Sequence, residues 1–68
     1  MGSLKVSVNK SSCSVTYTLL GREGDIAAWE TALLRQYPPA GYGTREVWRC
    51  TTADGLVKAE VYRSASCD

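Results

Sequence analysis

The sequence predicts an α+β fold of two layers, in which one helix packs on a four-stranded, mainly antiparallel sheet in the order ββαββ. Two observations lead to this prediction. One central stretch repeats its apolar residues at helical spacing, and two pairs of stretches with alternating apolar and polar residues flank it. The 68 residues suffice for one domain, 1–68. A chain of this length buries only about 60% of its unfolded surface, so the core is thin.

The helix is expected over residues 25–37. Asp25 suits the N-cap, because its carboxylate can accept hydrogen bonds from the free amides of the first turn and lies at the positive end of the helix dipole. Pro38 ends the helix, since proline lacks an amide hydrogen and disfavours helical geometry in the residue before it. Spacings of three and four residues place four apolar side chains on one buried stripe: Ile26, Trp29, Leu33 and Tyr37.

Ala27 and Leu34 lie off this stripe and next to each other on the helical wheel. One interpretation is a wide apolar face with an exposed flank, because scattered exposed apolar residues are ordinary. The other is a contact surface for a second chain.

Four strands are expected, over residues 4–8, 13–19, 44–52 and about 56–64. The first pair is joined by the polar turn 9–12, and the second pair by Asp54-Gly55, a strong hairpin signal. Alternation predicts one buried face for each strand. The side chains expected to point inward are Leu4, Val6 and Val8 of the first strand, Trp48 and Cys50 of the third, and Val57, Ala59 and Val61 of the fourth. Those expected to point outward from the third strand are Arg45, Val47, Arg49 and Thr51, while Glu46 shares the inward parity at the sheet margin.

Two strand orders, 2-1-3-4 and 1-2-4-3, give wholly antiparallel sheets, and the pattern does not choose between them. The cysteines bear on the choice. If the second and fourth strands are neighbours, Cys13 and Cys67 lie toward the same end of the sheet and a disulfide is geometrically feasible. The favoured alternative is that Cys13 and Cys50 are small core hydrophobes and that Cys67 is a free thiol.

Composition argues against several classes of function. The net charge is +1 and there is no histidine, the usual general base near neutral pH. The three cysteines lack the spacing of a zinc site, and no glycine-rich phosphate loop opens a helix. The sequence therefore predicts a non-catalytic protein with no metal and no cofactor. No stretch resembles a signal peptide or a membrane span, so a cytoplasmic protein without a membrane partner is expected.

The favoured function is protein binding. Two prolines stiffen residues 38–43, and a stiff loop that displays tyrosine makes contacts at low entropic cost. The predicted contact residues are Tyr42, Tyr37, Leu34, Arg45 and Arg49. The partner is another protein or a second copy of the chain, because a homodimer would supplement the thin core.

The alternative is nucleic-acid binding by the uncovered face of the sheet. Basic side chains with an aromatic ring on an open sheet can hold phosphates and stack a base. The residues placed there are Lys5, Arg45, Arg49 and Lys58, with Tyr62, Thr16 and Thr18. A merely solvated face explains the same charges. Size and architecture resemble those of small accessory proteins of phages and other mobile elements, a likeness that carries no function by itself.

Overall fold

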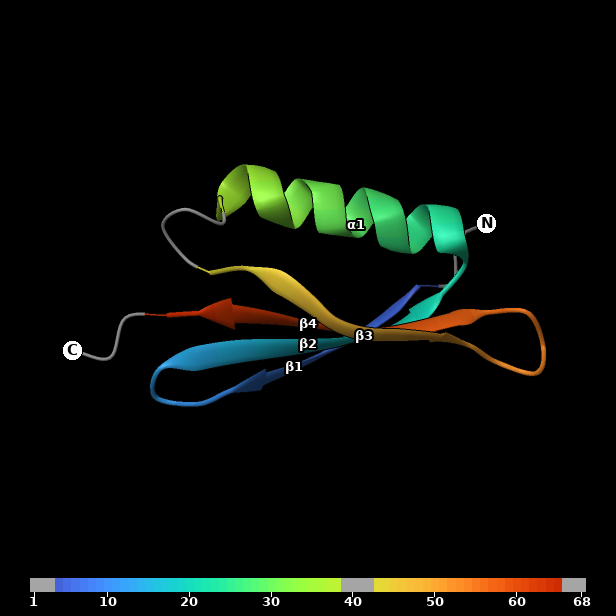
Figure 1. Cartoon of the computed structure of the whole chain (residues 1–68), viewed down its shortest axis with the longest axis horizontal. Coiled ribbons are helices and arrows are strands. Elements are labelled where there is room, and N and C mark those ends of the chain that lie inside the picture. The colour runs from blue at the N-terminus through green and yellow to red at the C-terminus, as the bar shows by residue number, and fades with distance from the viewer. Residues whose placement is uncertain (1–3, 39–42, 66–68) are drawn as a thin grey trace.

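A computed structural model describes residues 4–38 and 43–65 of the chain, and it has the predicted architecture. The sheet is wholly antiparallel, in the order β1-β2-β4-β3, and α1 lies along one side of it (Figure 1). This selects the second of the two strand orders left open. The elements are β1 (Lys5–Lys10), β2 (Ser14–Gly21), α1 (Glu23–Gln36), β3 (Arg45–Thr51) and β4 (Val57–Ser64).

The core lies between α1 and the two central strands. The predicted stripe of α1 is confirmed, because Ile26 and Leu33 are buried and Trp29 and Tyr37 pack against the core. The sheet contributes Leu19 of β2 and the predicted inner face of β4, Val57, Ala59 and Val61.

The helix begins two residues earlier than predicted. Its N-cap residue is Arg22, which has extended backbone angles and makes no side-chain capping bond. The prediction that Asp25 caps the helix is therefore wrong. Asp25 and Glu23 instead lie in the first turn, where their negative charges still complement the helix dipole.

The first strand is exposed along Lys5–Lys10, contrary to the prediction of a buried face, although Leu4, just before it, packs against the core as predicted. Val6 and Val8 lie opposite Leu19 and Tyr17 of β2, so they are on the helix side of the sheet. They are nevertheless 39% and 53% exposed. The reason is width: a helix with its side chains is about 10 Å across, and strands are about 4.8 Å apart, so one helix covers about two strands.

A β-bulge inverts the predicted alternation of β3. Glu46 lies opposite Val61, but Trp48 lies opposite Glu60, so Val47 is the extra residue between them. Cross-strand neighbours share a face. Because Val61 is in the core, Glu46 faces the helix, whereas Trp48 is on the open face with Glu60.

Past the bulge, each residue of β3 takes the opposite face from the predicted one. Cys50 lies opposite Lys58 on the open face, while Arg49 and Thr51 lie opposite the buried Ala59 and Val57. The prediction of an inward Trp48 and Cys50, and of an outward Arg49 and Thr51, is wrong for this reason. Arg45, before the bulge, is on the open face as predicted, opposite Tyr62.

The cysteines also differ from the favoured prediction. Cys13 is exposed and disulfide-bonded, and Cys50 is an exposed free thiol, so neither is a core residue. Cys67 lies outside the described residues. A disulfide at this end of the sheet was predicted to be feasible if the second and fourth strands are neighbours, and β2 and β4 do pair. The Ala65 amide also donates to the Cys13 carbonyl at 2.9 Å, so the chain just after β4 lies beside Cys13.

We expect the two described cysteines to differ in alkylation. In the unfolded, unreduced protein, iodoacetamide should label Cys50 at once and Cys13 only after reduction, as read by peptide mass spectrometry. Reduction should lower the free energy of unfolding by about 2–4 kcal/mol, because it frees the unfolded chain from a crosslink. Labelling of Cys13 without reductant would contradict the disulfide.

Candidate functional site

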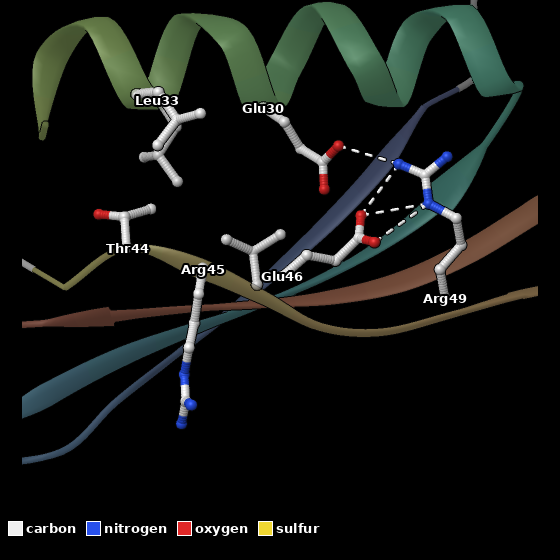
Figure 2. Close-up of a pocket in the computed structure, with 8 residues that line it drawn as sticks. Glu30, Leu33, Thr44, Arg45, Glu46 and Arg49 are labelled. Atoms are coloured by element: carbon white, nitrogen blue, oxygen red, sulfur yellow. Dashed lines mark hydrogen bonds and ion pairs between the residues drawn. The ribbon is translucent and has the colours of Figure 1, made fainter. Parts of the chain in front are cut away.

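A pocket of about 350 Å³ lies between α1 and β3 (Figure 2). Its apolar part is formed by the buried Leu33 and Val61 and by Leu34, which is 41% exposed. Its other end is polar. The lining residues are Glu30, Leu33, Leu34, Thr44, Arg45, Glu46, Arg49 and Val61.

The pocket lies where β3 is left outside the apolar core. The helix packs over β2 and β4, and every residue of β3 is exposed. At one end, the Thr44 hydroxyl donates to the Tyr37 carbonyl at 3.1 Å and ties the start of β3 to the end of the helix. At the other end the helix and the strand are joined by charged side chains.

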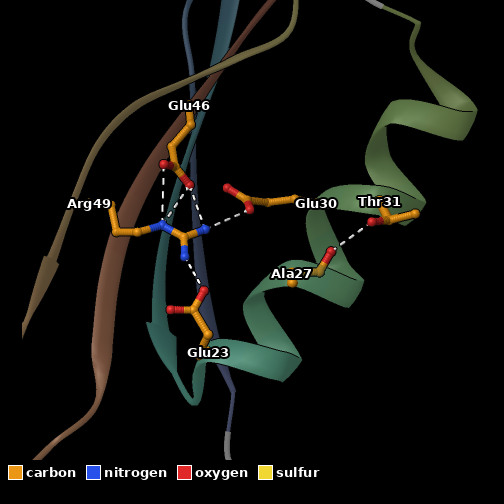
Figure 3. Close-up of polar contacts among 6 residues, drawn as sticks. All are labelled: Glu23, Ala27, Glu30, Thr31, Glu46 and Arg49. Carbon is orange, nitrogen blue, oxygen red and sulfur yellow. Dashed lines mark hydrogen bonds and ion pairs between the residues drawn. The ribbon is translucent and has the colours of Figure 1, made fainter.

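These charged side chains surround the guanidinium of Arg49 (Figure 3). Its Nη2 lies 2.9 Å from Glu46 Oε2 and 3.0 Å from Glu30 Oε1, and its Nη1 pairs with Glu23. Glu46 and Arg49 are both in β3, and Glu23 and Glu30 are in α1. We call these four residues the Arg49 cluster. It contains three carboxyl groups and one cation, so it is acidic as a whole when all four groups are ionised.

Glu30 is the most perturbed carboxyl of the cluster. Its side chain is 19% exposed, and burial raises its pKa from 4.5 to about 7, aided by a hydrogen bond to Glu46 and by repulsion from its charge. Arg49 opposes this shift. The hydrogen bond to Glu30, and then that from Arg49, lower the pKa of Glu46. The proton shared by the pair therefore resides on Glu30.

The structure brings together three of the five predicted contact residues. Leu34, Arg45 and Arg49 line the pocket, although the Arg45 guanidinium points away from the helix (Figure 2). Tyr37 lies in a second pocket, of about 280 Å³, with Tyr17 and Trp29 among its lining residues. Tyr42 lies outside the described residues.

Sequence reasoning missed Glu30, Glu46 and Thr44 as pocket residues. The signal for the first two was present in part, because Glu30 lies seven residues after Glu23 on one side of the helix and Glu46 has inward parity. Arg49, the fourth member of the cluster, was predicted on the opposite face of the sheet because the bulge reverses its side.

The open face of the sheet has a different character. The Arg45 guanidinium lies over the Tyr62 ring, 5.3 Å from its centroid. Trp48, 39% exposed, is on the same face. Lys58 also belongs to it, but Glu60 lies directly opposite Trp48. Lys5 shares this face as predicted, because it lies opposite Leu20, which lies opposite Lys58, so the face combines two aromatic rings with three cations and one carboxylate.

Within residues 4–38 and 43–65, no group of three or more His, Cys, Asp or Glu side chains is arranged to hold a metal ion. The described helix is too short and too polar to span a membrane. Comparison with protein-family models, with curated proteins and with solved structures found no match.

The raised pKa of Glu30 gives a prediction for stability. The folded state holds a proton that the unfolded state releases near pH 4.5, so the free energy of unfolding should fall as the pH rises from 4.5 toward 7. After allowance for solvent screening, we expect a loss of about 1–2 kcal/mol. Glu30→Gln, which mimics the protonated form, should lack this loss in urea unfolding at successive pH values.

Glu60→Gln serves as the control, because Glu60 lies on the open face away from the pocket. This variant should retain the wild-type pH slope. An equal slope in wild type and Glu30→Gln would refute the assignment of the proton to Glu30.

Proposed function

We propose that the protein is a small non-catalytic binding domain that holds a partner protein at the pocket between α1 and β3. One observation carries this proposal: an open pocket with an apolar floor lies where α1 and an exposed edge strand diverge, and the predicted contact residue Leu34 forms its exposed apolar wall. Clefts with an apolar base and a few convergent polar groups are the usual form of binding sites.

The lining indicates the chemistry of the partner. Leu33, Leu34 and Val61 offer contacts to an apolar side chain. The Arg49 cluster at the other end has more carboxyl groups than cations, so it complements a lysine or arginine of the partner. The proposed ligand is therefore a protein segment with an apolar and a basic residue close together.

A perturbed carboxyl in a pocket is also a feature of acid catalysts, but ion-pair networks perturb pKa values as well. Arg49 occupies the carboxyl groups of this cluster, and this favours a structural origin. A hydrolase screen is the check: turnover that is abolished by Glu30→Gln or Glu46→Gln would overturn the non-catalytic assignment.

A displayed library of random peptides tests the proposed pocket. We expect selection on the wild-type protein to enrich peptides that combine apolar and basic residues. Their affinity should fall at least tenfold for Leu34→Glu, which places a charge at the exposed apolar wall of the pocket. Isothermal titration calorimetry measures the change.

Ala28→Glu is the matched control, because it adds the same charge to an exposed position of the same helix outside the pocket. It should leave the affinity within about twofold. Enriched peptides that bind both variants equally well would place the contact surface elsewhere. Failure to enrich any peptide would count against the binding function itself.

Nucleic-acid binding by the open face is the second candidate. The observation that favours it is the Arg45–Tyr62 stack beside Trp48, since aromatic rings and cations on an open sheet are what stacked bases and phosphates require. Single-stranded oligonucleotides at low salt should then bind with an affinity that falls steeply with salt.

Two arginine variants make this prediction specific. Arg45→Ala should weaken oligonucleotide binding in fluorescence anisotropy, whereas Arg49→Ala removes the same charge from the helix side and should have a smaller effect. Equal effects of the two variants, or no binding at low salt, would exclude the open face as a specific site.

The compartment is part of the proposal. A disulfide at Cys13 favours an oxidising environment over the cytoplasm that the sequence suggests, because cytosolic thiols are kept reduced. An accessory role in a phage or another mobile element is a hypothesis that depends on size and architecture alone.

A further inference from the structure

Among the strands that the structure describes, β1 lies at one edge of the sheet, and none of them pairs with its outer side. It pairs with β2 without any register shift along all of Lys5–Lys10, and β2 occupies only one of its two sides. Val6 and Val8 project on the helix side, where α1 does not reach them. A straight edge strand with exposed apolar side chains is a template for pairing with another strand.

We propose that β1 pairs antiparallel with β1 of a second copy of this chain, about a twofold axis at Ser7, so that the two sheets become one continuous sheet with both helices on the same side. This inference does not depend on the proposed function, because it uses the opposite edge of the sheet from the α1–β3 pocket.

The side chains of β1 select the register. With Ser7 opposite Ser7 of the second copy, Val6 lies opposite Val8 of the second copy, and Val8 opposite Val6. All four valines then form one apolar patch on the helix side. A shift by one residue would oppose Val8 to Ser7 and Val6 to Asn9, because such a slip moves a strand's side chains to the other face.

The charges of β1 fit the same register. Lys5 lies opposite Asn9 of the second copy, and Lys10 opposite Leu4, so no two lysines face each other across the junction. The interface is isologous, as a twofold dimer requires, because each contact occurs twice.

The other edge of the sheet does not offer this geometry. The bulge at Val47 breaks the regular spacing of backbone groups in β3, and bulges are a common means of protecting an edge from pairing. The two edges therefore differ in kind: β3 is protected, and β1 is open.

Disulfide trapping tests both the contact and its register. In a Cys50→Ser background, which removes the exposed free thiol, Ser7→Cys should form a covalent dimer on mild oxidation. Its two thiols would lie on strands whose facing Cα atoms are about 4.5–5.5 Å apart, within disulfide range. Asn9→Cys is the matched control on the same strand and face. Its thiols would be about 13 Å apart and should not crosslink.

Sedimentation equilibrium tests the association without crosslinking, from about 1 μM to about 500 μM protein. Wild type should dimerise in this range, Val8→Lys should remain monomeric, and Val47→Lys, an equal change on the other edge, should dimerise like wild type. Circular dichroism confirms that each variant is folded.

Monomeric wild type throughout this range would overturn the proposal. So would a Ser7→Cys variant that fails to crosslink, or an Asn9→Cys variant that crosslinks as readily. The trapping result stands even if Val8→Lys fails to fold, because Ser7→Cys changes only an exposed polar side chain.

Discussion

The structure depends on one geometric constraint: a single helix is too narrow for four strands. A helix covers about two strands, and here these are the central pair, β2 and β4. The core is confined to the contact between them and α1. Both outer strands are left uncovered on the helix side, each with its own character. The pocket beside β3 and the exposed Val6 and Val8 of β1 both arise because the helix is too narrow to cover the outer strands.

On the β3 side, charge takes the place of apolar contact. The helix cannot reach the strand with its buried stripe, and the gap is bridged by long polar side chains that meet at Arg49. Such side chains span a distance that leucine or valine would not. The cost is a partly desolvated carboxyl, which is why the pKa of Glu30 rises and its proton is released near neutral pH and not near pH 4.5.

The sequence predicts the elements well, because each is encoded locally. The helical stripe needs only the spacing of Ile26, Trp29 and Leu33, and the second hairpin needs only Asp54-Gly55, whose glycine has φ +84°. It predicts the site less well, because the site depends on relations between elements. Nothing in residues 44–52 marks Val47 as an extra residue, so strict alternation assigned Trp48 and Arg49 to the wrong faces. Likewise, alternation in β1 predicts two faces but not whether a helix lies over either of them.

The bulge determines which side chains of β3 face the helix and which lie on the open face. If Val47 took a regular place in the ladder, the composition of the strand would be the same, and yet Trp48 and Cys50 would face the helix and Arg49 would lie on the open face. Deleting Val47 would have no such effect, because Glu46 would still lie opposite Val61 and Trp48 opposite Glu60. The acidic pocket beside α1 therefore depends on how this strand pairs with β4, which its amino-acid content does not reveal.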